Sequence, residues 1–110
     1  MNSDWKTATI ALSGTTSGAV DLERSFRSLI VAIPTISNGT LSLTVSDTSD
    51  GTYQALYGIS LTDGDDDQVL CSTGTGGFTV VVPYFGFQHL KVVASAEQAA
   101  ARAIKVCGFN

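Results

Sequence analysis

The stretch that decides the fold reads Thr40-Leu41-Ser42-Leu43-Thr44-Val45-Ser46-Asp47. Its apolar residues, Leu41, Leu43 and Val45, alternate with polar ones, and successive side chains of a β-strand point to opposite faces. The dipeptide directly before it, Asn38-Gly39, favours a tight turn. The pattern therefore predicts a strand with one face on a core and the other toward solvent.

Strand signals of this kind recur along the chain at intervals of about 8–12 residues, separated by Gly, Asn, Asp and Ser. One of them, Leu29-Ile30-Val31-Ala32-Ile33, is apolar at every position, which predicts a central strand covered on both faces. Pro83 should end another strand, because proline cannot donate a ladder hydrogen bond. The predicted strands are Thr7–Leu12, Ser17–Leu22, Leu29–Ile33, Thr40–Asp47, Thr52–Tyr57, Gln68–Ser72, Phe78–Val82, His89–Ser95 and Arg102–Cys107.

Helix signals are nearly absent from the chain. Ala96–Arg102 is rich in alanine and predicts at most a single helical turn, with a loop as the alternative, because so short a segment cannot sustain an isolated helix. Parallel strands need long crossover connections, so a chain with almost no helix indicates antiparallel sheets. The sequence predicts an all-β fold, an antiparallel, jelly-roll-like β-sandwich of about eight or nine short strands.

The composition is that of one folded domain. The chain has 110 residues, of which 44% are hydrophobic and 15% charged, whereas disordered chains are poor in apolar residues and rich in charge. A chain of this length builds one core. We expect a single domain over residues 1–110, in which residues 1–6 could form an N-terminal arm.

The charge pattern argues against two classes of partner. The net charge is −4, and the six Lys and Arg residues are scattered, whereas phosphate backbones are bound by clustered positive charge. The start of the chain, Met1–Trp5, has neither the basic nor the apolar region of a signal peptide. The longest apolar run, Leu29–Pro34, is too short to span a bilayer. We expect no nucleic-acid partner, no membrane association and synthesis in a cytoplasm.

Residues for catalysis are missing from the sequence. His89 is the only histidine, and no Gly-x-Ser-x-Gly motif accompanies it, although a hydrolase needs a base held against an activated nucleophile. We interpret His89 as an ordinary residue at the start of a strand. Gly74-Thr75-Gly76-Gly77 is interpreted as a hairpin loop, because a phosphate cradle would be followed by a helix and not by a strand. No enzyme activity and no cofactor are predicted.

Metal ligands and cysteines are also few. One histidine and two cysteines are too few and too scattered for a zinc site. Asp63, Asp65 and Asp67 form the best calcium candidate, and the alternative is a solvated acidic turn. Cys71 and Cys107 could form a disulfide, but without an export signal two thiols are the default prediction.

Four segments of the chain, taken together, resemble a known group of proteins. These are Val20-Asp21-Leu22, Ser28–Pro34, the turn and strand Ser46–Tyr57, and the link and strand Gln98–Val106. Their order resembles that of small β-sandwich virion proteins of tailed bacteriophages, which include capsid decoration proteins and head or tail appendage modules. The resemblance covers most of the chain, from about Val20 to Val106.

The resemblance implies a structural role in a virion. It brings no catalytic residues, and it implies attachment to the major capsid protein or another virion protein, and assembly as a homo-oligomer, for which a trimer is our expectation. Trp5 and Lys6 are candidate partner-binding residues, because large aromatic residues dominate interfaces. Trp5 could instead belong to the core of the first strand.

The alternative function is a carbohydrate- or receptor-binding module of a phage tail or fibre. Sugar sites use exposed aromatic side chains with polar neighbours. The available aromatic residues are Tyr53, Tyr57, Tyr84, Phe85 and Phe87, although aromatic residues at strand ends also commonly belong to a core.

Overall fold

A computed structural model describes residues 3–37, 39–48, 51–59, 66–68, 70–73, 76–83 and 85–110. Of these, Tyr57–Ile59, Asp66–Gln68, Leu70–Thr73 and Phe78 are described by their backbone alone.

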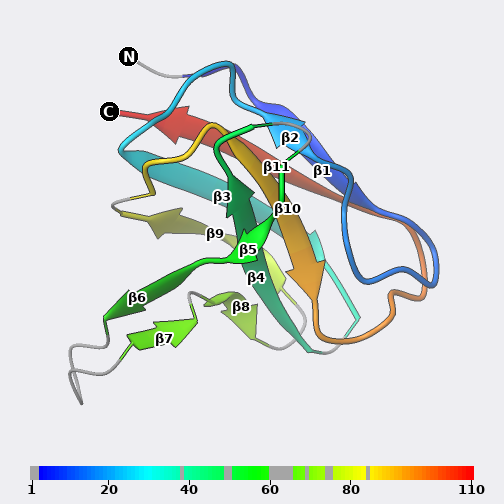
Figure 1. Cartoon of the computed structure of the whole chain (residues 1–110). Coiled ribbons are helices and arrows are strands. Elements are labelled where there is room, and N and C mark those ends of the chain that lie inside the picture. The colour runs from blue at the N-terminus through cyan, green and yellow to red at the C-terminus, as the bar shows by residue number, and fades with distance from the viewer. Residues whose placement is uncertain are drawn as a thin grey trace.

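The described chain forms two antiparallel sheets and a small ribbon (Figure 1). Sheet A has the order β1 (Lys6–Ile10), β11 (Arg102–Phe109), β3 (Ser28–Thr35), β9 (Gly76–Val82). Sheet B has the order β2 (Val20–Asp21), β10 (His89–Ala94), β4 (Thr40–Ser46), β5 (Gln54–Ala55), and β8 (Leu70–Thr73) also pairs with β4. β6 (Tyr57–Ile59) and β7 (Asp66–Gln68) pair with each other. The predicted all-β antiparallel sandwich is confirmed.

Most consecutive strands lie in different sheets. The chain passes from β1 in sheet A to β2 in sheet B, back to β3, and on to β4, and the same alternation relates β8, β9, β10 and β11. As a result, the first and last strands are neighbours, with Lys6 opposite Val106 and Ile10 opposite Arg102 (Figure 1).

The core lies between the two sheets. Leu41, Leu43 and Val45 of β4 are buried, and they lie opposite Ala94, Val92 and Leu90 of β10. The inward face predicted for Thr40–Asp47 is therefore confirmed, but the prediction that the other face is open to solvent is wrong for Ser42 and Ser46, which are also buried. Sheet A contributes inward-facing residues of all four strands, namely Ala8, Ile10, Leu29, Val31, Ile33, Val82, Ile104 and Val106.

The prediction that Leu29–Ile33 is covered on both faces is wrong for the isolated chain. β3 lies inside sheet A, between β11 and β9, and its inward residues Leu29, Val31 and Ile33 are buried. Ile30 and Ala32, on the opposite face, are only half-buried. The strand is central within its sheet, but among the described residues no second layer buries its outer side.

Proline is tolerated in this strand because of its position. β11 pairs with β3 from Phe109 opposite Ser28 to Lys105 opposite Ala32, and the pairing stops there. Pro34 lies beyond that point, so its missing N–H removes no hydrogen bond from the pairing with β11.

Two predicted segments are interrupted in the structure. Ser17–Leu22 keeps only Val20–Asp21 as a strand, because the Ser17 hydroxyl accepts a hydrogen bond from the Val92 N–H (2.9 Å) and Thr16 forms an isolated bridge with Val93. Thr52–Tyr57 divides between β5 in sheet B and β6 in the ribbon. The first segment keeps β10 as its partner on both sides of the break, since Val20 lies opposite Leu90, whereas the second segment changes its partner.

The predicted hairpin at Gly74–Gly77 is wrong as a hairpin within one sheet. Residues 74 and 75 lie outside the described residues, but β8 pairs with β4 whereas β9 pairs with β3, so the connection joins the two sheets. Local sequence does not show which sheet each of two consecutive strands joins.

Ala96–Arg102 forms the predicted loop alternative rather than a helical turn. The buried Gln98 holds this loop: its Oε1 accepts hydrogen bonds from the Ser37 N–H (2.9 Å) and from Arg102 Nε (3.3 Å). Its Nε2 donates to the Ala96 carbonyl (2.9 Å). These bonds replace the backbone bonds that a helix would make.

Candidate interaction surface

The outer face of sheet A is almost uncharged. Strand alternation and register place on this face the exposed or half-buried residues Thr7, Thr9, Ser28, Ile30, Ala32, Pro34, Thr79, Val81, Ala103, Lys105 and Phe109. Lys105 is the only charged one, and Val81 is 56% exposed. Of the three large hydrophobic side chains exposed in the described chain, Val81 lies on this face, Trp5 lies beside it and Leu12 lies elsewhere.

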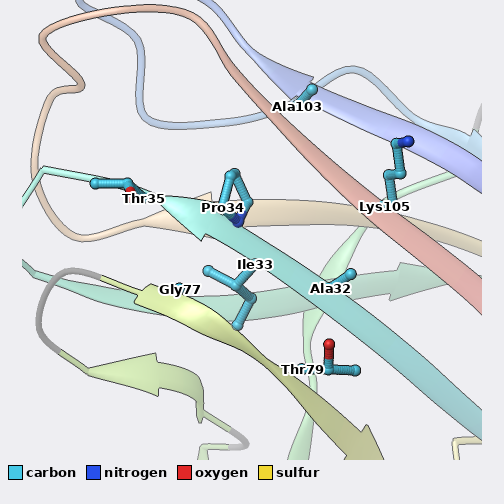
Figure 2. Close-up of a pocket in the computed structure, with 8 residues that line it drawn as sticks. All are labelled: Ala32, Ile33, Pro34, Thr35, Gly77, Thr79, Ala103 and Lys105. Carbon is cyan, nitrogen blue, oxygen red and sulfur yellow. The ribbon is translucent and has the colours of Figure 1, made fainter.

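A shallow depression of about 500 Å³ lies on this face, where β11 and β3 stop pairing. Figure 2 shows its lining, in which Ile33 points away from Pro34 and Lys105. The surface is recessed here because its residues have short side chains or none, namely Ala32, Pro34, Ala103 and Gly77. The lining offers one amine and two hydroxyl groups, those of Lys105, Thr35 and Thr79.

The predicted partner-binding residues lie at the edge of this face. Trp5 immediately precedes β1 and is 54% exposed, so its alternative placement in the core is wrong. The alternation of β1 puts Trp5 on the same side as the exposed Thr7. Lys6 is the first residue of β1, and its Nζ lies 3.4 Å from Glu23 Oε2.

The described N-terminal residues run beside β11 at the edge of sheet A. The Ser3 N–H donates to the Gly108 carbonyl (2.7 Å), and the Gly108 N–H donates to Ser3 Oγ (2.8 Å). These bonds fix the chain beside β11 just before Trp5. The aromatic ring is therefore held on a bound segment.

The outer face of sheet B differs in both polarity and burial. Its strands place Ser42, Ser46 and His89 there, and all three are buried. Lys91 lies on the same face, with its Nζ 4.5 Å from the centre of the half-buried Tyr53 ring. The chain itself thus covers much of this polar face.

His89 lies beside a carboxylate, but the pair lacks the geometry of a catalytic dyad. His89 Nδ1 is 3.8 Å from Asp21 Oδ1, beyond hydrogen-bond distance, and it has no hydrogen-bond partner. A hydrogen bond from Gln88 Nε2 (3.0 Å), and then one from the Glu23 N–H (2.7 Å), lower the pKa of Asp21 below its ordinary value.

No described hydroxyl is activated by this pair. Ser46, opposite His89 in the sheet, donates its hydroxyl to the Thr48 carbonyl (2.8 Å) and accepts the Thr48 N–H (3.2 Å). Its hydroxyl is therefore committed to the turn after β4. The structure places His89 at the start of β10, as the sequence predicts.

The calcium candidate falls largely outside the described chain. Asp63 and Asp65 are not among the described residues, and Asp67 is described by its backbone alone in β7. In the described remainder, no cluster of three acidic, histidine or cysteine residues could hold a metal ion. The described residues also contain no helix that could cross a membrane.

Cys107 is a buried free thiol, and its Sγ lies 3.3 Å from the Ser3 carbonyl oxygen. The side chain of Cys71 is not among those described. The sequence-based default of unpaired thiols therefore holds for Cys107.

The aromatic residues of the alternative function are divided between core and surface. Phe85 is buried in the core, and its ring meets the half-buried Phe87 ring edge-on, with centroids 5.9 Å apart. Tyr84 and the side chain of Tyr57 lie outside the described residues. A second depression, of about 450 Å³, lies beside Phe87 and is lined by polar residues that include Ser46, Asp47, Thr48 and Gln54.

Sequence reasoning did not single out Ile30 and Val81 as surface residues. The signal was present in Leu29–Ile33, whose alternate residues are all apolar although only one of its faces meets the core. A strand of this kind can be covered by its own chain or by another, and the sequence does not distinguish the two.

Comparisons with known proteins find likeness at the level of structure only. No family model matches the chain. No curated protein sequence matches it either. The SPBc2 prophage-derived protein YomS superposes with a TM-score of 0.55 at 16% identity, over 98% of this chain and 94% of that one.

Two further structures superpose less well. The C-terminal domain of a structural protein from Sulfolobus turreted icosahedral virus gives a TM-score of 0.43 at 12% identity, over all of both chains. The Yersinia pseudotuberculosis-derived mitogen gives 0.42 at 10% identity, over 100% of this chain and 86% of that one. The likeness that carries weight is therefore the one to YomS, and at this identity it shows that the two chains share a fold.

Proposed function

We propose that this protein is a non-enzymatic structural protein of a bacteriophage virion, which decorates the assembled head by binding the major capsid protein through the outer face of sheet A. The observation that carries the proposal is that the outer face of sheet A is nearly uncharged and that no described part of the chain covers it. A nearly uncharged face that leaves an apolar side chain such as Val81 exposed is a candidate interaction site in a soluble protein.

The strand order supports a virion role. Read across the sheets, the orders β1-β11-β3-β9 and β2-β10-β4-β8 are those of a jelly roll, an architecture common in viral capsid domains. The fold is also that of a prophage-derived protein. Because a fold hosts many functions, the surface has to carry the assignment of a partner.

An exposed anchor residue suits attachment to a surface that repeats the same site many times. Trp5 is the natural anchor, because a large, exposed aromatic side chain held on a bound segment loses little freedom on binding. A capsid presents many identical sites, so modest affinity at each site suffices when copies of this protein bind together.

Co-sedimentation with capsids assembled from the major capsid protein of the same phage tests the proposal. We expect the native protein to sediment with capsids and Trp5→Ala to bind at least about thirtyfold more weakly, since truncation of an interface anchor costs about 2 kcal/mol or more. Leu12→Ala is the matched control, because Leu12 is also an exposed large apolar residue but lies outside sheet A.

Two results would reject the assignment. One is that the native protein stays in the supernatant when capsids are present in excess. The other is that Leu12→Ala weakens binding as much as Trp5→Ala does, because the binding surface would then not be the outer face of sheet A.

A second candidate function is glycan or receptor binding at the depression beside Phe87. A half-buried aromatic ring beside Asp47 and Gln54 matches the mixture of apolar and polar groups found in small-ligand sites. Binding to a glycan array that is lost in Gln54→Ala, while capsid binding persists, would favour this candidate. An array without binding would exclude it.

A further inference from the structure

Lys105 lies within the outer face of sheet A and not at its rim. It belongs to β11, which has β1 on one side and β3 on the other. The residues directly opposite it are Thr7 on β1 and Ala32 on β3, and Thr79 of β9 lies opposite Ala32. The only charged side chain of this face therefore has neutral neighbours across every strand of the sheet.

Lys105 has no acidic partner in the described chain. The acidic and basic side chains that lie close together there are Lys6 with Glu23 and His89 with Asp21. Lys105 is exposed, and it forms no hydrogen bond with a described residue. Water therefore solvates its ammonium group as long as the face is open.

A partner that covers this face takes that water away. An ammonium group that is buried without a partner is strongly unfavourable, and buried charges in proteins are therefore paired. A lysine at the rim of an interface can turn its amine outward to water, but Lys105 has the strands of the same face on both sides. The opposite charge has to come from the partner.

The depression beside Lys105 favours a protruding part of the partner. It has a volume of about 500 Å³. In Figure 2, Lys105 and Ala103 lie on β11, along one side of the depression, and Ala32 and Pro34 lie on β3. Apart from Lys105, the side chains of these four residues are short, so a loop of another protein can enter between the strands.

A backbone acceptor in the same depression lacks a partner in the sheet. Gly108 turns its N–H and C=O groups toward Ser3, on the side of β1, and alternation therefore turns those of Ala103 toward β3. The residue of β3 at the matching position is Pro34, which has no N–H. The Ala103 carbonyl thus receives no ladder hydrogen bond from β3 and can accept one from a loop seated there.

On the basis of the proposed function, we infer that the major capsid protein seats a protruding loop in this depression and places an aspartate or glutamate carboxylate on Lys105 Nζ. A backbone N–H of the same loop donates to the Ala103 carbonyl. A charged pair of this kind fixes orientation and selects the partner, whereas the exposed Trp5 provides affinity. Lys105 is then the specificity-determining residue of the face.

Co-sedimentation with capsids tests the pair through Lys105→Met. We expect this variant to bind at least about thirtyfold more weakly than the native protein, because the carboxylate of the partner is left buried without its counter-charge. Lys91→Met is the matched control, because it also removes one lysine but lies on the outer face of sheet B, and it should bind like the native protein. Circular dichroism shows whether both variants are folded.

Capsids with amidated carboxylates distinguish a carboxylate from a neutral acceptor. Carbodiimide coupling to ethanolamine converts exposed carboxylates to neutral amides. The native protein should bind such capsids about as weakly as Lys105→Met binds unmodified ones, and amidation should not weaken the binding of Lys105→Met further. Because the chain carries a net charge of −4, removal of negative charge from the capsid would otherwise strengthen binding.

Three outcomes would overturn the inference. They are native-like binding by folded Lys105→Met, equal weakening of binding by Lys105→Met and Lys91→Met, and equal weakening by amidation for the native protein and Lys105→Met. In each case the native protein still binds, so the proposed function stands without this pair. A native protein that binds no capsid would instead reject the proposed function and the pair together.

Discussion

The outer faces of the two sheets differ in polarity and in burial. Sheet B turns serines and a histidine outward, and the chain buries Ser42, Ser46 and His89. Sheet A turns mostly small and apolar residues outward, and it leaves Val81 and the neighbouring Trp5 more than half exposed. In an isolated soluble domain, the apolar face would be expected to be the covered one. In the described residues this order is reversed, which is the basis for proposing a partner on sheet A.

The comparison depends on which residues of sheet B face the core, and Leu43→Asp tests this with the largest expected effect. The substitution places an unpaired charge in a fully buried position, and we expect a loss of more than about 4 kcal/mol, enough to unfold a small domain. Thermal unfolding followed by circular dichroism measures it. Thr44→Asp is the control, because Thr44 faces outward opposite Lys91 and should change stability by less than about 0.5 kcal/mol. A folded Leu43→Asp with an unchanged melting temperature would invalidate the assignment of faces.

A sharper comparison sets an aspartate on each outer face. Ser42→Asp buries a charge on the covered face of sheet B and should cost about 2–4 kcal/mol, whereas Thr9→Asp on the open face of sheet A should cost less than about 0.5 kcal/mol. Urea unfolding of both variants gives the two free energies. Equal costs would mean that the faces do not differ in coverage.

The smallest expected effect concerns the exposed rim of sheet B. Gln88→Ala removes the strongest cause of the lowered pKa of Asp21, so that pKa should rise toward its ordinary value near 3.8, as followed by carboxyl chemical shifts. Because the folded pKa lies below the unfolded one, Asp21 contributes stability above the unfolded pKa, and that contribution is lost as pH falls through the folded pKa. Gln54→Ala, at an exposed site on β5, should leave the titration of Asp21 unchanged. A pKa of Asp21 that stays the same without Gln88 would show that this hydrogen bond does not set it.

The sheet-forming segments could be predicted from the sequence because local alternation specifies them. Thr40–Asp47 shows a strict alternation, and Leu41, Leu43 and Val45 are buried as it predicts, although Ser42 and Ser46 on the other face are buried as well. The bounds of strands were harder to predict: the strand predicted to begin at Ser17 begins only at Val20, and the Ser17 hydroxyl accepts a hydrogen bond from the N–H of Val92, a residue far away in the sequence. The passage of the chain between sheets at Gly74–Gly77 depends on such distant pairings as well.

The candidate surface could be predicted only in part. Trp5 was identifiable as a large aromatic residue near the chain start, but its exposure depends on the bonds of Ser3 to Gly108. The apolar run Leu29–Ile33 predicts a strand covered on both faces, and only the fold shows that no second layer among the described residues covers its outer face. The alternation of apolar residues shows which side chains avoid water, whereas the order of the strands decides whether another part of the chain can bury them.

Hydroxyl-radical footprinting of the protein, free and bound to capsids, tests most directly whether a partner covers the outer face of sheet A. Trp5 and Leu12 are both more than half exposed in the free chain, so both should be modified readily. With capsids present, we predict that modification of Trp5 falls severalfold while that of Leu12 is unchanged. Continued modification of Trp5 at the free rate in the bound protein would contradict the account.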